Sequence, residues 1–339
     1  MNLPQTIRIL SRKSDLAIIQ ARQVGNKISE QFPDVKIEYI SKKTSGDIDL
    51  ITPLSEMPSA GVFTDDLRND LIANECDLAV HSWKDLPLDL GPNTVLAGSL
   101  SRADQRDILF IKQNKIKEIK ENKFITILSS SPRRVYNLDP FIKNYLPLNC
   151  KKVTFLNIRG NIPSRFNKFI EGKADGIIIA KAAIDRLLNN DVKELRETLA
   201  LMKENIKKCL WVITPLSQNP TSPGQGALGI EVKKDNKQLI EMITSISDQQ
   251  TLECVNKERK ILKAYGGGCH QKIGVSFFPT YFGLMKAAKG EMENRDQFYT
   301  WEWNNKKHID KKISANLLFP IKSEDQKFFK RKEIEESIE

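Results

Sequence analysis

The sequence predicts an α/β protein with two similar α/β halves followed by a smaller third region. Short apolar runs alternate with stretches of helical periodicity, which is typical of a parallel or mixed sheet. This alternation restarts at residue 124, and the glycines at 266–268 precede a stretch of alternating apolar and aromatic residues. The chain has 339 residues, which at ~150 residues per domain corresponds to two or three domains.

The first half begins with a short apolar run that predicts a buried strand. Apolar residues from Leu16 to Ile28 then recur at helical spacing, whereas residues 35–41 alternate between apolar and charged side chains. The expected strands of this half are residues 7–10, 35–41, 77–81, 95–99 and 107–111, and the expected helices are 14–28 and 63–73.

The second half repeats this order. Its expected strands are residues 124–128, 153–157 and 176–180, and its expected helices are 132–138, 162–171 and 182–188. The Pro/Gly loop at 221–226 leads into an apolar strand at 227–232, which we expect to return to one of the halves. The Lys-rich stretch 112–123 has no interleaved aromatic residues, so we interpret it as a solvated connector rather than a nucleic-acid patch.

The third region is expected to contain helices at 239–246 and 252–265 and a small antiparallel sheet within 273–303. The charged stretch 323–339 is interpreted as a solvated helix or a disordered end. We therefore predict a first domain from 1–102 and 213–232, a second from 103–212, a third from 233–320, and a charged tail at 321–339.

Composition and charge narrow the function classes. Lys and Arg number 53 against 43 for Asp and Glu, so the net charge is +10 and favours a nucleic acid, a membrane surface or an acidic small molecule as partner. No apolar run approaches the ~20 residues of a membrane-spanning helix, and the first residues carry no secretory signal pattern, so we expect a cytoplasmic protein. The five cysteines are scattered without a C-x-x-C motif and the three histidines are isolated, which predicts reduced thiols and no metal site.

Basic and hydroxyl residues cluster where expected strands lead into helices. Each arginine taken alone would most often form a surface salt bridge. As a set, they would converge on the crevice between two α/β halves and favour a ligand with several carboxylates or phosphates. No G-x-x-x-x-G-K-[ST] is present, which excludes a P-loop nucleotide site, and no G-x-G-x-x-G follows an expected strand. The residues of this set are Arg12, Ser14, Ser131, Arg133, Arg134, Arg159, Arg165 and Arg186.

Two further segments stand out. Asp85 follows an expected strand, where it could stabilise a cationic intermediate or transfer a proton, although pairing with Lys84 or a nearby arginine has equal weight. The preceding His81 is interpreted as a hydrogen-bonded structural residue. The three glycines before Cys269 would present that thiol on a loop; the residues alone favour an incidental cysteine in a flexible turn, with a covalent role second.

Together these segments resemble the porphobilinogen deaminase family, also called hydroxymethylbilane synthases. The resemblance runs from about Ile7 to Gly274, and more weakly to about Trp303. The co-occurrence of the motifs in order makes it specific. The matching motifs are Ser11-Arg12-Lys13-Ser14, Thr44-Ser45-Gly46-Asp47, Gly61-Val62-Phe63, His81-Ser82-Trp83-Lys84-Asp85-Leu86-Pro87, Ser129-Ser130-Ser131-Pro132-Arg133-Arg134, Arg159-Gly160-Asn161 with Arg165, Pro223-Gly224-Gln225-Gly226-Ala227 and Gly267-Gly268-Cys269.

The resemblance implies a fold of three domains. The first two would be α/β lobes like those of type II periplasmic binding proteins, with a cleft between them, and the third a small α/β domain with an antiparallel sheet. It implies a monomeric transferase that joins four porphobilinogen molecules head to tail, releases ammonia and yields hydroxymethylbilane for haem biosynthesis. A hand-off to uroporphyrinogen III synthase would follow, without nucleic acid or membrane.

The resemblance also implies roles for individual residues. Asp85 matches the catalytic aspartate, which would support loss of ammonia and stabilise the azafulvenium cation. Cys269 matches the anchor of a dipyrromethane cofactor held by a thioether, which would explain a lone cysteine on a glycine loop. The residues that match substrate- or cofactor-binding positions are Arg12, Ser14, Lys84, Ser131, Arg133, Arg134, Arg159, Arg165 and Arg186. No metal is implied.

The chain departs from the family pattern in a loop that resembles a lid. Glu56 and Ala60 stand where two lysines are usual, Ser45 stands where an arginine is common, and His270 follows the cysteine where Ser or Gln is more usual. We expect these changes to alter affinity rather than reaction type. One alternative is a catalytically impaired, two-lobed binding protein for an acidic small molecule, against which the retention of Asp85 and Cys269 counts. Another, a nucleic-acid-binding protein, rests on the net charge alone.

Overall fold

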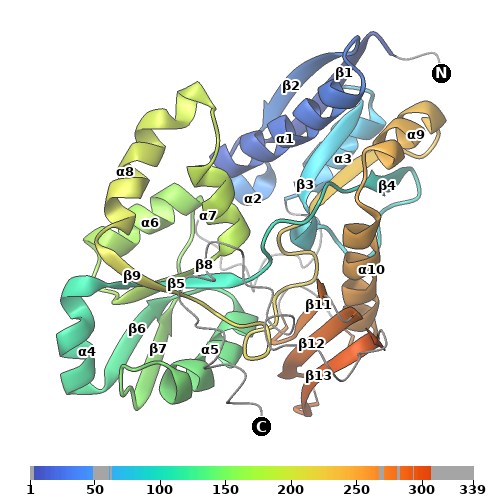
Figure 1. The fold of residues 1–339 in the computed structure, drawn as a ribbon. Helices are drawn as coiled ribbons and strands as arrows, with labels where there is room; N and C mark the ends of the chain where they lie inside the picture. Colours follow the sequence, from blue (N-terminus) through green and yellow to red (C-terminus); the bar gives the residue numbers. More distant parts are fainter. Residues whose placement is uncertain are drawn as a thin grey trace, which may run out of the picture.

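Two five-stranded sheets and one three-stranded sheet form the framework of the protein. The computed structural model describes residues 4–48, 61, 63–266, 271–280, 283–292 and 294–306. The two larger sheets belong to two lobes, and the small sheet lies beside them with one long helix (Figure 1). This arrangement confirms the predicted fold class of two α/β lobes followed by a small region with an antiparallel sheet.

The first lobe is built on a sheet with the strand order β2-β1-β3-β10-β4. Its strands are β1 (Thr6–Arg12), β2 (Lys36–Lys42), β3 (Leu78–Ser82), β4 (Thr94–Gly98) and β10 (Leu228–Lys233). β1 is parallel to β2 and β3, whereas β10 runs antiparallel to β3 and β4. Its helices are α1 (Asp15–Gln31), the short α2 (Ser45–Ile48), α3 (Asp65–Ile72) and α9 (Lys237–Ser245).

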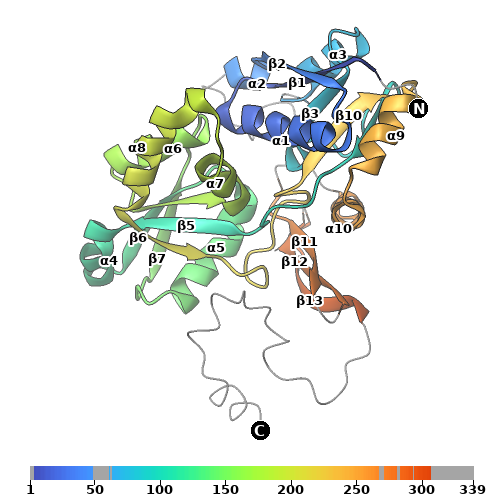
Figure 2. The same cartoon turned by 45° about the horizontal axis from the view of Figure 1, so that its top comes forward.

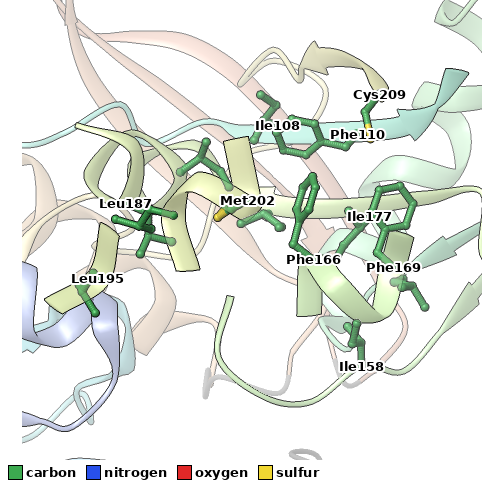
Figure 3. Close-up of a cluster of buried hydrophobic side chains, with 14 of the residues drawn as sticks. Ile108, Phe110, Ile158, Phe166, Phe169, Ile177, Leu187, Leu195, Met202 and Cys209 are labelled. Atoms are coloured by element: carbon green, nitrogen blue, oxygen red, sulfur yellow. The ribbon is translucent and has the colours of Figure 1, made fainter. Parts of the chain in front are cut away.

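The second lobe has the strand order β7-β6-β8-β5-β9. Its strands are β5 (Asp107–Lys112), β6 (Phe124–Leu128), β7 (Lys152–Leu156), β8 (Gly176–Ala180) and β9 (Cys209–Ile213). Its helices are α4 (Ile116–Asn122), α5 (Pro132–Tyr145), α6 (Ile162–Glu171), α7 (Lys181–Leu188) and α8 (Arg196–Ile206). Phe110 of β5, Phe166 of α6 and Met202 of α8 meet in one buried apolar cluster (Figure 3).

The two sheets share one plan. In each, three parallel strands are followed by one antiparallel strand, β10 in the first lobe and β5 in the second. The chain therefore crosses between the lobes twice, once from β4 to β5 and once from β9 to β10. The predicted return of the strand after the 221–226 loop is confirmed, because β10 completes the sheet of the first lobe.

The third region combines α10 (Gln249–Ala264) with the antiparallel strands β11 (Gly274–Thr280), β12 (Gly283–Glu291) and β13 (Gln297–Lys306) (Figure 2). The fully buried Glu258 of α10 joins this region to both crossings. It accepts hydrogen bonds from Arg102 at 2.7 and 3.0 Å, from the Gly224 amide at 2.8 Å and from the Phe277 amide at 2.7 Å. One carboxylate thus ties α10, β11 and the two inter-lobe connections together.

Some elements differ from those expected. Helices α4 and α8 and strand β9 were not predicted, and the Lys-rich stretch interpreted as a connector contains α4, whose Ile119 is only 2% exposed. Helix α9 packs on the first sheet through Leu239, Met242 and Ile243, so the core of the first lobe extends beyond residue 232. The domain boundaries remain a prediction. None of the described helices is both long and apolar enough to cross a membrane.

Candidate active site

The turns that follow the parallel strands place side-chain caps on the next helices. Ser14 caps α1 by accepting the Ala17 amide at 3.4 Å, and Ser131 caps α5 by accepting the Arg134 amide at 3.5 Å. Asn161 caps α6 in the same way. Because helix N-termini present unpaired backbone N–H groups, these turns suit anions.

Asp85 lies on a short 3₁₀ turn, Trp83–Asp85, directly after β3. The Trp83 side chain is 2% exposed and packs against Leu86 and Ala227, which fixes this turn in place. The loop before β10 packs closely against this turn. A Cβ on Gly224 would lie 3.2 Å from the backbone nitrogen of Lys84, and the φ of Gly224 is +79°. Glycine is the residue that adopts this backbone without strain.

The pKa of Arg165 shows that several predicted site residues share one neighbourhood. Burial, the largest cause, and neighbouring cations together lower it to about 10, while the charge of Asp85 acts in the opposite direction. Arg165 itself donates to the Gly160 carbonyl at 2.6 Å. The cations that act on it are Arg134, Arg159 and Arg12. Arg12 of the first lobe, Arg134 and Arg159 of the second lobe, and Asp85 therefore all lie close enough to Arg165 to act on its charge.

Lys84 belongs to the same cluster. Burial lowers the pKa of its ammonium group, and Arg134 and Arg133 lower it further, whereas Asp85 and Asp107 raise it. A partly buried lysine near other cations is stabilised in its charged form by a ligand that brings negative charge.

Arg12 is held by its own partners at the end of β1. Its guanidinium pairs with Asp47, with Nε 3.2 Å from Oδ2, and lies 4.2 Å from the centre of the Phe63 ring. Burial opposes ionisation of Asp47, but the hydrogen bond and charge of Arg12 bring the pKa of this carboxyl below its usual range. Asp47 therefore fixes the direction of the Arg12 side chain.

Arg133 and Arg134 share one fully buried carboxylate, Asp107. Asp107 accepts from Arg133 Nη2 at 3.0 Å and from Arg134 Nη2 at 2.7 Å, and also from Asn219 at 3.0 Å and Gln225 at 2.8 Å. Burial alone would raise the pKa of Asp107, but the charges of Arg134 and Arg133 hold it well below its usual range. Arg133 is 3% exposed and also bonds the Asn219 side chain and the Pro220 carbonyl, so it forms part of a structural network.

Arg186 lies elsewhere, at the contact between the lobes. It is 8% exposed and donates to Gln23 Oε1 at 3.1 Å and to the Gly226 carbonyl at 2.9 Å. Burial lowers its pKa to about 10, and the neighbouring charge acting on it is that of Asp185.

Several predicted positions lie outside the described residues: Glu56, Ala60, Cys269 and His270. Ser45 is described, and its amide and hydroxyl both donate to Asp66, at 2.7 and 2.8 Å. His81 is 4% exposed and lies 3.0 Å from Glu231, as expected of a structural histidine. Among the residues that the structure describes, no group of His, Cys, Asp and Glu could hold a metal ion.

Sequence reasoning missed the two carboxylates that orient the arginines. Asp47 lies in a matched motif that predicts no role for it, and the sequence around Asp107 predicts only the start of a strand. Their partners lie far along the chain, as with Asp107 and Gln225, so spacing carries no signal for these pairs. A fully buried aspartate next to an inter-lobe connection becomes informative only once the fold is known.

A comparison with models of known protein families shows the family of this chain. Residues 7–241 match the family described as "Porphobilinogen deaminase, dipyromethane cofactor binding domain". The chain belongs to the porphobilinogen deaminase family. Members of this family are transferases of tetrapyrrole biosynthesis, and the matched residues span both lobes, including Asp85 and the arginine cluster. The resemblance seen in the motifs is thereby confirmed.

Individual porphobilinogen deaminases agree with this assignment. The porphobilinogen deaminase of Chlorobaculum parvum is 34% identical over 84% of this chain and 82% of its own. That of Nostoc is 34% identical over 80% of this chain and 77% of its own. Among solved structures, the periplasmic aliphatic sulphonate binding protein of Escherichia coli is similar at 14% identity, with a TM-score of 0.37, over 78% of this chain and 71% of that chain.

The donor set suits the dipyrromethane cofactor of porphobilinogen deaminases. That group is assembled from porphobilinogen and carries carboxylates, which pair well with guanidinium groups. The cations around Arg165 lower its pKa, so the site carries positive charge that bound carboxylates would offset. The residues present therefore fit the group.

Proposed function

We propose that this enzyme joins four porphobilinogen molecules head to tail, with loss of ammonia, and releases hydroxymethylbilane after hydrolysis. The single observation that carries the proposal is the meeting of Asp85 with the cations that lower the pKa of Arg165. A growing pyrrole chain is a polyanion that passes through a cationic intermediate. The site offers guanidinium groups for the first property and one carboxylate for the second.

Several cations of the site would bind the carboxylates of the pyrrole chain. Porphobilinogen carries one acetate and one propionate, so each addition brings two negative charges. Arg12, Arg134, Arg159, Arg165 and Lys84 would bind these groups, assisted by the helix N-termini at Ser14 and Ser131. Arg133 would act mainly by sharing Asp107 with Arg134.

Asp85 would act on the pyrrole ring itself. Its carboxylate would accept hydrogen bonds from pyrrole N–H groups and stabilise the cation that remains when ammonia departs. A ring carbon of the acceptor pyrrole then attacks that cation, and the proton on this carbon is lost. A carboxylate in a partly buried site can accept such a proton.

The alkaline limb of the pH profile would report on Lys84. We expect kcat/KM for porphobilinogen to fall at a pH below the ordinary lysine range of ~10.4, because burial and neighbouring cations lower the pKa of Lys84. Replacing Arg134 with glutamine removes one of these cations, so the limb should move to higher pH. An Arg196→Gln variant on the exposed surface of α8 should leave it in place. A limb that does not move in Arg134→Gln would contradict this coupling.

The dipyrromethane cofactor would be anchored by a thioether from Cys269. When bound, the cofactor supplies the two pyrrole rings from which the chain is extended. Intact-mass measurement of purified protein tests this anchor. We expect an adduct equal to two porphobilinogens less two ammonias, and its loss in Cys269→Ser. A Cys150→Ser variant is the matched control and should keep the adduct. An unmodified wild-type mass with every thiol free, even after incubation with porphobilinogen, would favour a binding protein for an acidic small molecule instead.

We further propose that the enzyme acts as a cytoplasmic monomer. The product would pass to a uroporphyrinogen III synthase, because hydroxymethylbilane is an open-chain tetrapyrrole that must be cyclised. Sedimentation of the purified protein alone and with that synthase would test the monomeric state and the association with the synthase.

A further inference from the structure

Helix α1 packs against both lobes. Val24 and Ile28 lie in the apolar core of the first lobe, whereas Ile19 is 2% exposed and belongs to the main core of the second lobe, with Leu16 packed beside it. A polar contact accompanies this packing, since Arg22 lies 4.0 Å from Glu194. α1 therefore contacts the cores of both lobes.

Arg186 extends this contact from the side of the second lobe. It lies on α7, next to α1 (Figure 1). Its Nε donates to Gln23 Oε1 of α1 at 3.1 Å, and its Nη2 donates to the Gly226 carbonyl at 2.9 Å. The side chain thus bonds one partner in the first lobe and one in an inter-lobe connection.

Gly226 marks the place where the two inter-lobe connections touch. Its carbonyl also accepts the Ala103 amide at 3.2 Å. Its φ is +88°, and a Cβ there would lie 2.5 Å from the Ala103 carbonyl oxygen, so glycine is needed. The Gly226 carbonyl therefore receives donors from the first connection and from the second lobe.

We infer that Arg186 is a positioning residue that holds the lobes together through Gln23 and the Gly226 carbonyl, a set we call the inter-lobe latch. The inference differs from the ligand role implied for Arg186 by the family resemblance. Two of its donors are engaged by protein acceptors, and its side chain is almost fully buried. The kinetic part of its test rests on the proposed function, whereas the exchange part does not.

Kinetics separates a latch from a carboxylate ligand. We expect Gln23→Ala to lower kcat for porphobilinogen by about 2- to 10-fold, as loss of one hydrogen bond allows. Arg186→Met should lower kcat at least as much, and the double variant should be no worse than Arg186→Met alone, because both changes break the same contact. Asn26→Ala, an exposed amide one turn further along α1, is the control and should match the wild type.

The opposite pattern would overturn the inference. If Gln23→Ala behaves like Asn26→Ala while Arg186→Met raises KM with kcat unchanged, Arg186 is a carboxylate ligand. If Arg186→Met does not fold, Arg186→Lys provides the same test, since lysine keeps the charge but cannot bond both acceptors with one planar group.

Hydrogen exchange tests the latch without substrate. Amides of α7 and of residues 221–227 should exchange at least 3-fold faster in Gln23→Ala than in Asn26→Ala, while amides of β6 and β8 stay unchanged. Equal exchange in both variants would reject the latch even if the enzyme is active. If no variant, including wild type, consumes porphobilinogen, the proposed function fails while the exchange result still decides the latch.

Discussion

Asp85→Asn is expected to lower kcat for porphobilinogen consumption by about 10²- to 10⁴-fold, the range typical of a group that transfers a proton or stabilises charge in the transition state. The amide has nearly the same shape, so the turn held by Trp83 and Leu86 should persist. It carries no negative charge, however, and cannot stabilise a cation or accept a proton. KM should change much less than kcat, because Lys84 and the arginines remain in place. Steady-state rates on cofactor-loaded protein measure this effect.

Asp89→Asn is the matched control for this experiment. Asp89 lies four residues further along, is exposed and pairs with Lys263 at 2.8 Å. We expect it to change kcat by less than about 2-fold, since exposed ion pairs contribute little. An Asp85→Asn enzyme within a few-fold of the wild type would remove Asp85 from the chemistry and favour the plain pairing of Asp85 with its cationic neighbours.

Asp107→Asn is expected to have the largest effect on stability. Removing this carboxylate leaves the guanidinium groups of Arg133 and Arg134 buried without their shared anion, and breaking a buried ion pair costs about 3–5 kcal/mol. Denaturant unfolding of the variant against the wild type measures the difference. Asp104→Asn, a less buried carboxylate paired with Arg106 at 2.7 Å, should cost less than about 1 kcal/mol. Equal losses in the two variants would refute a special role for Asp107.

The pH dependence of stability provides a second measure of Asp107. Its pKa in the folded protein lies below the ordinary value of ~3.9, because Arg134 and Arg133 outweigh the effect of burial. The carboxylate therefore contributes its full stability above about pH 4, and this contribution is lost as the pH falls towards the folded-state pKa. The free energy of unfolding should accordingly fall less steeply with acid in Asp107→Asn than in the wild type.

The sequence predicted elements well where local periodicity agrees with packing. β6, β8 and α6 begin and end at the expected residues, because each apolar run is bounded by turn residues. α8 escaped prediction because charged residues stand at both of its ends and few of its side chains are buried, with Leu199 and Met202 as its buried apolar anchors. The Lys-rich α4 was not predicted because Ile119 is its one buried residue, which is too few for an apolar periodicity.

For the candidate site, the sequence indicates residue types, whereas the contacts between those residues come from the structure. The motifs pointed to Asp85 and to cations at strand-to-helix turns, and the structure brings Arg12, Arg134, Arg159 and Arg165 together. The partner of each arginine depends on contacts between segments that are distant in the sequence. The hydrogen bond between Arg186 and Gln23 is an example. Such pairings follow from tertiary packing and leave no local pattern.

The placement of β10 has a consequence for how this chain folds during synthesis. β10 joins β4 to the rest of the first sheet, yet β4 ends at Gly98 and β10 begins at Leu228. Roughly 130 residues must be made in between, which at about 5–20 residues per second takes on the order of ten seconds. Until then β4 has no place in its sheet, and such distant pairings slow folding. The N-terminal lobe is therefore expected to close its sheet only after the strands of the second lobe have left the ribosome.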